Sequence, residues 1–294
     1  MNKLNNKTSL SFLVPNIKFS SSSKSKLILN LIQETNALTK RLIIQARRRP
    51  STVLAGIIQP LLWLILFGAL FQNAPITLFS ISHSYRHFLT PGIIVFTVFT
   101  GALNAGLPLM FDREFGFLNR LIVAPLVSQF SIVVSSALFI SGLSFLQTFI
   151  IMSTMIFVEN PIKGNNLIVS LIIITLLTCG LTMFSIGLSF ILPGHIELLA
   201  LILIINLPLL FASTALVPFS FMPMWLQILA SINPLSYAIE SIRFLYSNDT
   251  WTLATLIMKN IWGSFSLFQI IVLLLVFNII LGIFVIYCIQ AKIK

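Results

Sequence analysis

Histidine and cysteine are the residues of this chain best suited to metal binding or redox chemistry, and their spacing supports neither. His83 and His87 stand four residues apart, as two metal ligands on one helix would. No third or fourth ligand lies near them, and a zinc site needs three or four. Cys179 and Cys288 fall inside apolar segments, where a free cysteine behaves as a small hydrophobic side chain. The sequence therefore predicts no metal site and no disulfide framework.

Catalytic chemistry is also unsupported. Serine is plentiful, but no histidine is placed with an acid in the arrangement that a serine hydrolase needs. A phosphate-binding loop requires a Gly-Lys pair followed by Ser or Thr, and the chain contains no Gly-Lys dipeptide. We therefore predict a protein that is not an enzyme, that binds no cofactor and that has no ATP site of its own.

One loop, residues 112–129, has the length and composition of a helix that docks on another protein. It mixes acids, arginines and apolar residues, and Pro125 lies near its end. Its charged members are Asp112, Arg113, Glu114 and Arg120.

A second basic segment, residues 31–50, has the pattern of an amphipathic helix. Leu38 and Leu42 are four residues apart, with basic residues around them. Such a helix tends to lie in the membrane interface, although a simple topology anchor would explain the same residues. Pro50 is expected to end the helix, because the residue before a proline disfavours the α conformation. The arginines at this end are Arg47, Arg48 and Arg49.

The stretch Met222–Tyr246 is too polar for a membrane span and too apolar for a free loop. Pro223 and the Asn233-Pro234 pair divide it into two short helical pieces. It is either an interfacial or re-entrant hairpin, in which Glu240 and Arg243 pair locally, or a lid over an exit path.

The elements that must position these residues are membrane helices. Hydrophobic residues make up 57% of the chain and charged residues 9%, against about 25% charged in soluble domains. Each apolar run has about 20 or more residues, enough to cross a bilayer as a helix. A β-barrel would instead show short alternating segments. The predicted spans are Thr52–Phe71, Phe88–Phe111, Phe130–Val158, Leu167–Leu192, Leu198–Val217 and Leu267–Ile289.

Charge placement sets the predicted topology. With six spans, 14 of the 18 Lys and Arg residues fall on one side of the bilayer together with both chain ends. Short loops rich in Lys and Arg stay on the side from which insertion occurs, so this side is the inside. The net charge of +11 therefore reflects topology and lipid contact, and nucleic-acid binding, which needs a basic face on a folded domain, is not expected.

The domain boundaries follow from these patterns. Residues 1–30 are polar and contain no acid, which predicts a disordered inside tail; a cleaved transit peptide is the alternative, although such peptides are rich in Arg. Residues 31–50 form the interfacial helix, and residues 51–294 form the transmembrane domain.

Polar residues inside the predicted spans are few. They either hold helices together or line a path. No ionisable residue lies in the middle of a span, which argues against a proton-coupled carrier. The polar residues include Gln59, Asn104, Asn206, Gln269 and Asn278.

Three motifs resemble those of ABC-2 type transporter permeases, in the family's order and spacing over residues 31–294. The first is Arg49-Pro50 ahead of the first span. The second runs from Asp112 to Gly116 and from Arg120 to Leu126, with Phe115 where family members often carry a polar or charged residue. The third contains Asn233, Pro234, Tyr237, Glu240 and Arg243. With its Ile-rich composition, the chain looks most like plastid-encoded members of red-algal lineages.

The resemblance implies a fold and a function. The fold is an all-α membrane protein with six transmembrane helices, an N-terminal interfacial helix and an outer helical hairpin. The function is the permease subunit of an ABC exporter in a plastid membrane, or alternatively in a bacterial inner membrane. It implies an ABC ATP-binding subunit that binds the ATP, and pairing as a homodimer or with another permease half.

The resemblance also assigns roles to residues. Residues 112–125 would be the coupling helix against the ATPase, and residues 31–49 the interfacial helix beside it. Glu114 would be a polar anchor there, unless it is only a solvated loop acid. The competing function is a membrane assembly factor that transports nothing.

Overall fold

The computed structural model describes residues 24–48, 50–71, 85–116, 130–156, 164–248 and 250–293. These residues are almost entirely helical. The α-helices are α1 (Lys24–Arg48), α2 (Pro50–Leu70), α3 (Tyr85–Leu103), α4 (Leu107–Glu114), α6 (Phe130–Ile156), α7 (Gly164–Ile191), α8 (His195–Phe211), α9 (Met224–Ile232), α10 (Pro234–Ser247) and α11 (Leu267–Ile293). Short 3₁₀ helices are η2 (Asn104–Gly106) and η3 (Phe219–Phe221), and the strands are β1 (Leu256–Asn260) and β2 (Gly263–Ser266).

Among the described residues, four helical segments are long and apolar enough to cross a membrane. They are His87–Glu114, Ser131–Ile151, Gly164–Ile191 and Leu267–Ala291. The other two predicted spans correspond to shorter apolar helices, Leu54–Leu70 and His195–Phe211. The predicted fifth span continued to Val217, but α8 ends at Phe211 and turns follow. Pro208 lies in the last turn of α8, and a proline inside a helix removes one backbone hydrogen bond.

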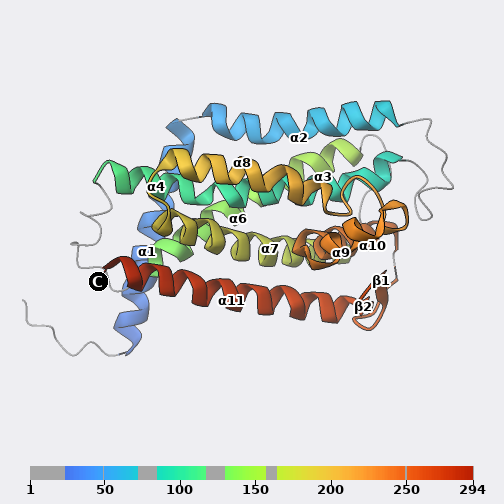
Figure 1. Cartoon of the computed structure of the whole chain (residues 1–294). Helices are drawn as coiled ribbons and strands as arrows, with labels where there is room; N and C mark the ends of the chain where they lie inside the picture. The colour runs from blue at the N-terminus through green and yellow to red at the C-terminus, as the bar shows by residue number, and fades with distance from the viewer. Residues whose placement is uncertain are drawn as a thin grey trace, which may run out of the picture.

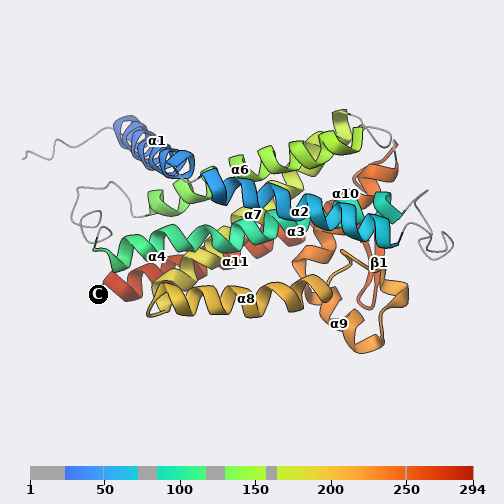
Figure 2. The same cartoon turned by 90° about the horizontal axis from the view of Figure 1, so that it is seen from above.

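The long helices lie side by side, and the smaller elements gather at the two ends of the bundle. Figures 1 and 2 show α1, the end of α4, the start of α8 and the C-terminus at one end of the bundle. The opposite end holds α9, α10 and the two strands. The first end carries the residues predicted to lie inside, and we call it the inside end. We call α9, α10, β1 and β2 the outer scaffold.

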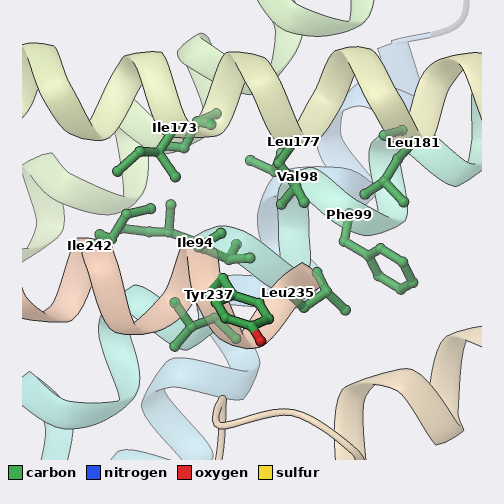
Figure 3. Close-up of a cluster of buried hydrophobic side chains, with 14 of the residues drawn as sticks. Ile94, Val98, Phe99, Ile173, Leu177, Leu181, Leu235, Tyr237 and Ile242 are labelled. Carbon is green, nitrogen blue, oxygen red and sulfur yellow. The ribbon is translucent and has the colours of Figure 1, made fainter. Parts of the chain in front are cut away.

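Helix α7 is the centre of the packing and contacts α11, α6, α3 and α10. Its apolar residues meet those of α3 and α10 in one buried cluster, shown in Figure 3. The labelled members are Ile94, Val98, Phe99, Ile173, Leu177, Leu181, Leu235, Tyr237 and Ile242. The helix α10 therefore belongs to the folded core and is not a loose lid.

The second predicted span is interrupted by η2, where it comes very close to α7. A Cβ on Gly106 would lie 2.4 Å from the carbonyl oxygen of Ser185, so only glycine fits. The backbone N–H of Gly106 donates to Ser185 Oγ at 2.9 Å, and this hydroxyl donates to the Leu103 carbonyl. The serine thus satisfies the backbone groups that the break releases.

The N-terminal helix is longer than the sequence predicted. It begins at Lys24, so the helix extends over residues 24–30, which the sequence assigned to the tail. Residues 27–32 are all apolar except Asn30, and they extend the apolar pattern of the helix toward its start. Helix α1 packs mainly on α6.

A β-hairpin, which the sequence did not predict, leads into the last helix. Strands β1 and β2 pair antiparallel, with Asn260 opposite Gly263 across the turn. Gly263 has a φ of +126°, a conformation that is accessible mainly to glycine. The hairpin contacts α10 and the start of α11.

Candidate coupling site

The residues Asp112, Arg113 and Glu114, which we call the triplet, form the last turn of α4 at the inside end. Phe115 and Gly116 follow in a turn, and Gly116 has a φ of +72°, as is common after a helix C-terminus. The triplet therefore ends a membrane helix instead of starting a separate one. The rest of the predicted coupling helix, including Arg120 and Pro125, lies outside the described residues.

The first residue of the triplet binds α1. Nη2 of Arg41 lies 2.6 Å from both Oδ1 and Oδ2 of Asp112. The two side chains are 28% and 15% exposed, so the ion pair is partly shielded from solvent. It joins α1 to the end of α4.

The second residue caps the C-terminus of α7. Nη1 of Arg113 donates to the carbonyls of Ser189 at 2.7 Å and Phe190 at 3.4 Å. Nη2 donates to the carbonyls of Leu192 and Pro193, each at 2.5 Å. The last carbonyls of a helix have no partner within it and form the negative end of its dipole. The guanidinium of Arg113 donates hydrogen bonds to these carbonyls and places a positive charge at the negative end of the helix dipole.

The third residue caps the N-terminus of α8. The backbone N–H of His195 donates to Oε1 of Glu114 at 2.6 Å, and His195 Nδ1 lies 2.5 Å from Oε2. Gly194, the N-cap residue of α8, makes no side-chain cap, so a carboxylate from another helix takes this role.

The triplet therefore ties α1 and the inside ends of α4, α7 and α8 into what we call the inside clamp. The order of charges suits the helix ends, with the cation at a C-terminus and the anion at an N-terminus. The sequence left two roles open for Glu114, a polar anchor for the ATPase or a solvated loop acid. The structure adds an intramolecular role that neither alternative contained.

At the other end of the bundle, Arg243 is a buried charge with 4% of its surface exposed. It pairs with Glu240 one turn earlier, as the sequence predicted. Its Nη2 also donates to the Thr214 carbonyl at 2.7 Å, its Nε to the Phe88 carbonyl at 3.3 Å, and its Cζ lies 3.7 Å from the centre of the Phe88 ring. Burial lowers the pKa of Arg243, and the charge of Glu240 opposes this shift.

The local pair of the interfacial-hairpin alternative is therefore present, and both of its side chains are largely buried. Arg243 holds the start of α3 and the turns after α8 against α10.

Asn233 and Pro234 start α10. Asn233 is the N-cap residue, and its Oδ1 accepts from the N–H of Leu235 at 3.0 Å. Its Nδ2 donates to the carbonyls of Leu209 at 2.9 Å and Ala212 at 2.7 Å, which satisfies the end of α8. Pro234 takes the first helical position, where its missing N–H costs nothing.

Tyr237 connects the parts of the outer scaffold to one another, and Asn166 connects the scaffold to α7. The Tyr237 hydroxyl donates to the Ser231 carbonyl at 2.7 Å and accepts from Asn260 Nδ2 at 3.2 Å; burial raises the pKa of Tyr237, while the bond from Asn260 lowers it. Asn166 binds the carbonyls of Leu245 and Asn248 through Nδ2 and accepts from Trp251 Nε1. Sequence analysis missed Asn166, although an amide in the turn ahead of an apolar helix was a signal.

The remaining predicted site residues lie in α1, α2 and α3 or outside the described residues. Arg47 and Arg48 form the last turn of α1 and are exposed, Arg49 lies outside the described residues, and Pro50 is the first residue of α2. His87 packs on the Tyr246 ring with ring centres 4.5 Å apart, and His83 lies outside the described residues. Within the described part of the chain, no three metal-binding side chains come together.

One of the polar span residues joins two helices. Asn278 of α11 donates to the Leu176 carbonyl of α7 at 2.8 Å, which agrees with a packing role for an amide in a span.

Comparisons with known proteins agree with the resemblance seen in the motifs. Residues 33–246 match the ABC-2 type transporter family. A protein of Porphyra purpurea named "Putative transport permease ycf38" is 59% identical over 251 residues, which cover 85% of this chain and 86% of the relative. Proteins of the same name from Pyropia yezoensis and Cyanophora paradoxa are 56% and 54% identical, over 90% and 85% of this chain and 91% and 86% of the relatives. The chain therefore belongs to the ABC-2 type transporter family and is an integral membrane permease of the kind found in red-algal and glaucophyte plastids.

Proposed function

We propose that this chain is the membrane-spanning subunit of an ABC exporter, driven by ATP hydrolysis in a separate ATP-binding subunit. The inside clamp is the observation that carries the proposal, since it joins the helix ends next to the predicted coupling segment to three other helices. If the ATP-binding subunit displaces this segment, α1, α7 and α8 would move together with α4. The chain has no Gly-Lys dipeptide, so the energy must come from a partner.

In this proposal α2 and α8 also cross the bilayer, which gives six spans with both chain ends inside. Their apolar segments, Leu54–Leu70 and His195–Phe211, are at the lower limit of length for a spanning helix. The side-by-side arrangement of α2 and α8 with the longer helices in Figure 1 supports this assignment.

The proposal also includes a second permease half, which we place against α2. A groove of about 590 Å³ runs along this helix, and most of its lining is apolar. Gln59 lies in it, exposed, and its amide makes no hydrogen bond to any residue that the structure describes. Polar groups in a bilayer seek partners, so this face suits a second permease half and a polar path better than lipid. The groove residues used here are Leu54, Ile58, Gln59, Leu62 and Leu66.

The outer scaffold would then border the exit of the path. Helix α9 exposes Met224, Trp225, Ile228, Leu229 and Ile232, which form an apolar face on a short helix. We propose that this face lies in the outer interface of the bilayer, where Trp is commonly found.

Purification and ATPase assays test the proposed function. The wild-type chain, purified from its membrane in mild detergent, should carry along a subunit with a P-loop, and the complex should hydrolyse ATP. The chain alone should hydrolyse none. ATP turnover by the isolated chain, or a complex that lacks a P-loop subunit, would contradict the proposal.

A further inference from the structure

The charged side chains that the sequence predicted for docking already have partners within the chain, in the inside clamp. The side chains of Asp112, Arg113 and Glu114 bind α1, the end of α7 and the start of α8, respectively. A side chain engaged in this way is a poor anchor for another protein, because docking would first have to break its present bonds. The contact surface should therefore consist of neighbouring side chains.

Phe115 is the most exposed aromatic side chain beside the clamp. It is 81% exposed, and it has two contacts with Phe111 of α4. Its N–H donates to the Phe111 carbonyl at 2.9 Å, and its ring stacks on the ring of Phe111 at 6.3 Å between centres. The Phe111 ring in turn contacts His195 at 5.1 Å. A large apolar side chain is the kind of anchor that dominates binding energy at protein interfaces.

The first turn of α8 adds two exposed side chains to this surface. Ile196 is 69% exposed. Glu197 is also exposed and makes no hydrogen bond or ion pair with any residue that the structure describes. Its carboxylate and that of Glu114 flank Gly194, since a Cβ on that glycine would lie 2.7 Å from one and 3.1 Å from the other.

We propose that Phe115, Ile196 and Glu197, which we call the tip, form the surface on which the ATP-binding subunit docks. This inference rests on the proposed function. The matching surface would offer an apolar pocket for Phe115 and a Lys or Arg for Glu197. The triplet then lies behind the tip and transmits its movement to α1, α7 and α8.

Charge favours a protein over a lipid surface as the occupant. Anionic headgroups attract basic segments, and the carboxylate of Glu197 at the tip would be repelled by them. A cation on a protein surface complements this carboxylate and fixes the orientation of docking.

The test compares tip variants with a matched control at the same end of the bundle. F115A and E197R are introduced separately into the full chain in nanodiscs, with E197Q to remove only the charge. Y287A is the control, since Tyr287 of α11 is 72% exposed and has no place in the tip. The measurements are the Kd for the P-loop subunit that co-purifies with the wild-type chain and the melting temperature of each variant.

F115A should weaken binding by about 30-fold, and E197R should weaken it by about tenfold or more. E197Q should have a smaller effect than E197R, and Y287A none, with all melting temperatures close to wild type. Wild-type Kd values for F115A and E197R would overturn the tip assignment while leaving the proposed function intact. Absence of any P-loop subunit from wild-type preparations would overturn both.

A photo-reactive benzoylphenylalanine at position 115 supplies a second measurement that does not depend on affinity. Cross-linked peptides should come from the P-loop subunit. Cross-links to lipid, together with a lowered melting temperature of F115A, would make Phe115 a bilayer anchor and would overturn the proposal.

Discussion

The two ends of the bundle are held together by different kinds of bonds. At the inside end, the clamp joins side chains that are between 15% and 36% exposed, through ion pairs and helix-end caps. At the outer end, Arg243 is 4% exposed and Asn233 3%, and both bind backbone carbonyls. Partly exposed ion pairs contribute little to stability, whereas loss of one partner of a buried charge is costly.

This contrast suggests a division of roles between the two ends. Bonds that contribute little to stability can be broken and formed again during a transport cycle, whereas bonds between buried groups stay formed. Under the proposed function, the inside end is therefore suited to move as the partner subunit uses ATP, and the outer end to remain as a rigid frame. The predictions below test this contrast, beginning with the largest effect.

Loss of the Arg243 guanidinium should cause the largest loss of stability. R243M keeps most of the apolar length but leaves Glu240 and the carbonyls of Phe88 and Thr214 without their donor. The expected cost is about 3–5 kcal/mol, as for other buried pairs that lose one partner. Thermal unfolding of the chain in nanodiscs measures it.

The matched control is R113M, which removes an arginine of the same length at the inside end. It should lower the melting temperature less than R243M does. Equal effects of the two variants would show that the two ends do not differ in rigidity.

Exchange of two neighbouring charges in the clamp should impair coupling more than stability. The double variant R113E/E114R keeps composition and net charge, but it places an anion at the C-terminus of α7 and a cation at the N-terminus of α8. Both charges then oppose the helix dipoles. We expect substrate-stimulated ATPase activity of the complex to fall by about tenfold, while the basal activity of the ATPase subunit is retained.

The conservative double variant R113K/E114D serves as the control, because it keeps both charges in place. Wild-type stimulation in the exchanged variant would mean that the order of charges at the clamp has no role in coupling.

Several features of the fold could be read from the sequence because they depend on neighbouring residues. Apolar runs marked the long helices, and Pro223 and the Asn233-Pro234 pair marked the starts of α9 and α10. The family followed from the same local motifs and is confirmed by the match over residues 33–246.

The contacts of the inside clamp could not be predicted from neighbouring residues. The partners of the triplet lie 71 to 81 residues away along the chain, so no periodicity links them. Burial of Arg243 was missed for the same reason, since the Phe88 carbonyl that it binds is 155 residues away. The sequence showed which residues carry charge, and the fold decides which of them are already paired.

The ion pair between Arg41 and Asp112 should give the smallest effect on stability and the sharpest test of which helices the clamp joins. Because both side chains are partly exposed, R41A or D112A should cost about 0.5–1 kcal/mol. The exchanged pair R41D/D112R should recover part of this loss, because the attraction between the two positions is restored. Melting temperatures of the wild type, R41D, D112R and R41D/D112R in nanodiscs form a double-mutant cycle that isolates the pair. An exchanged pair no more stable than the sum of the R41D and D112R effects would show that this ion pair does not hold α1 to α4.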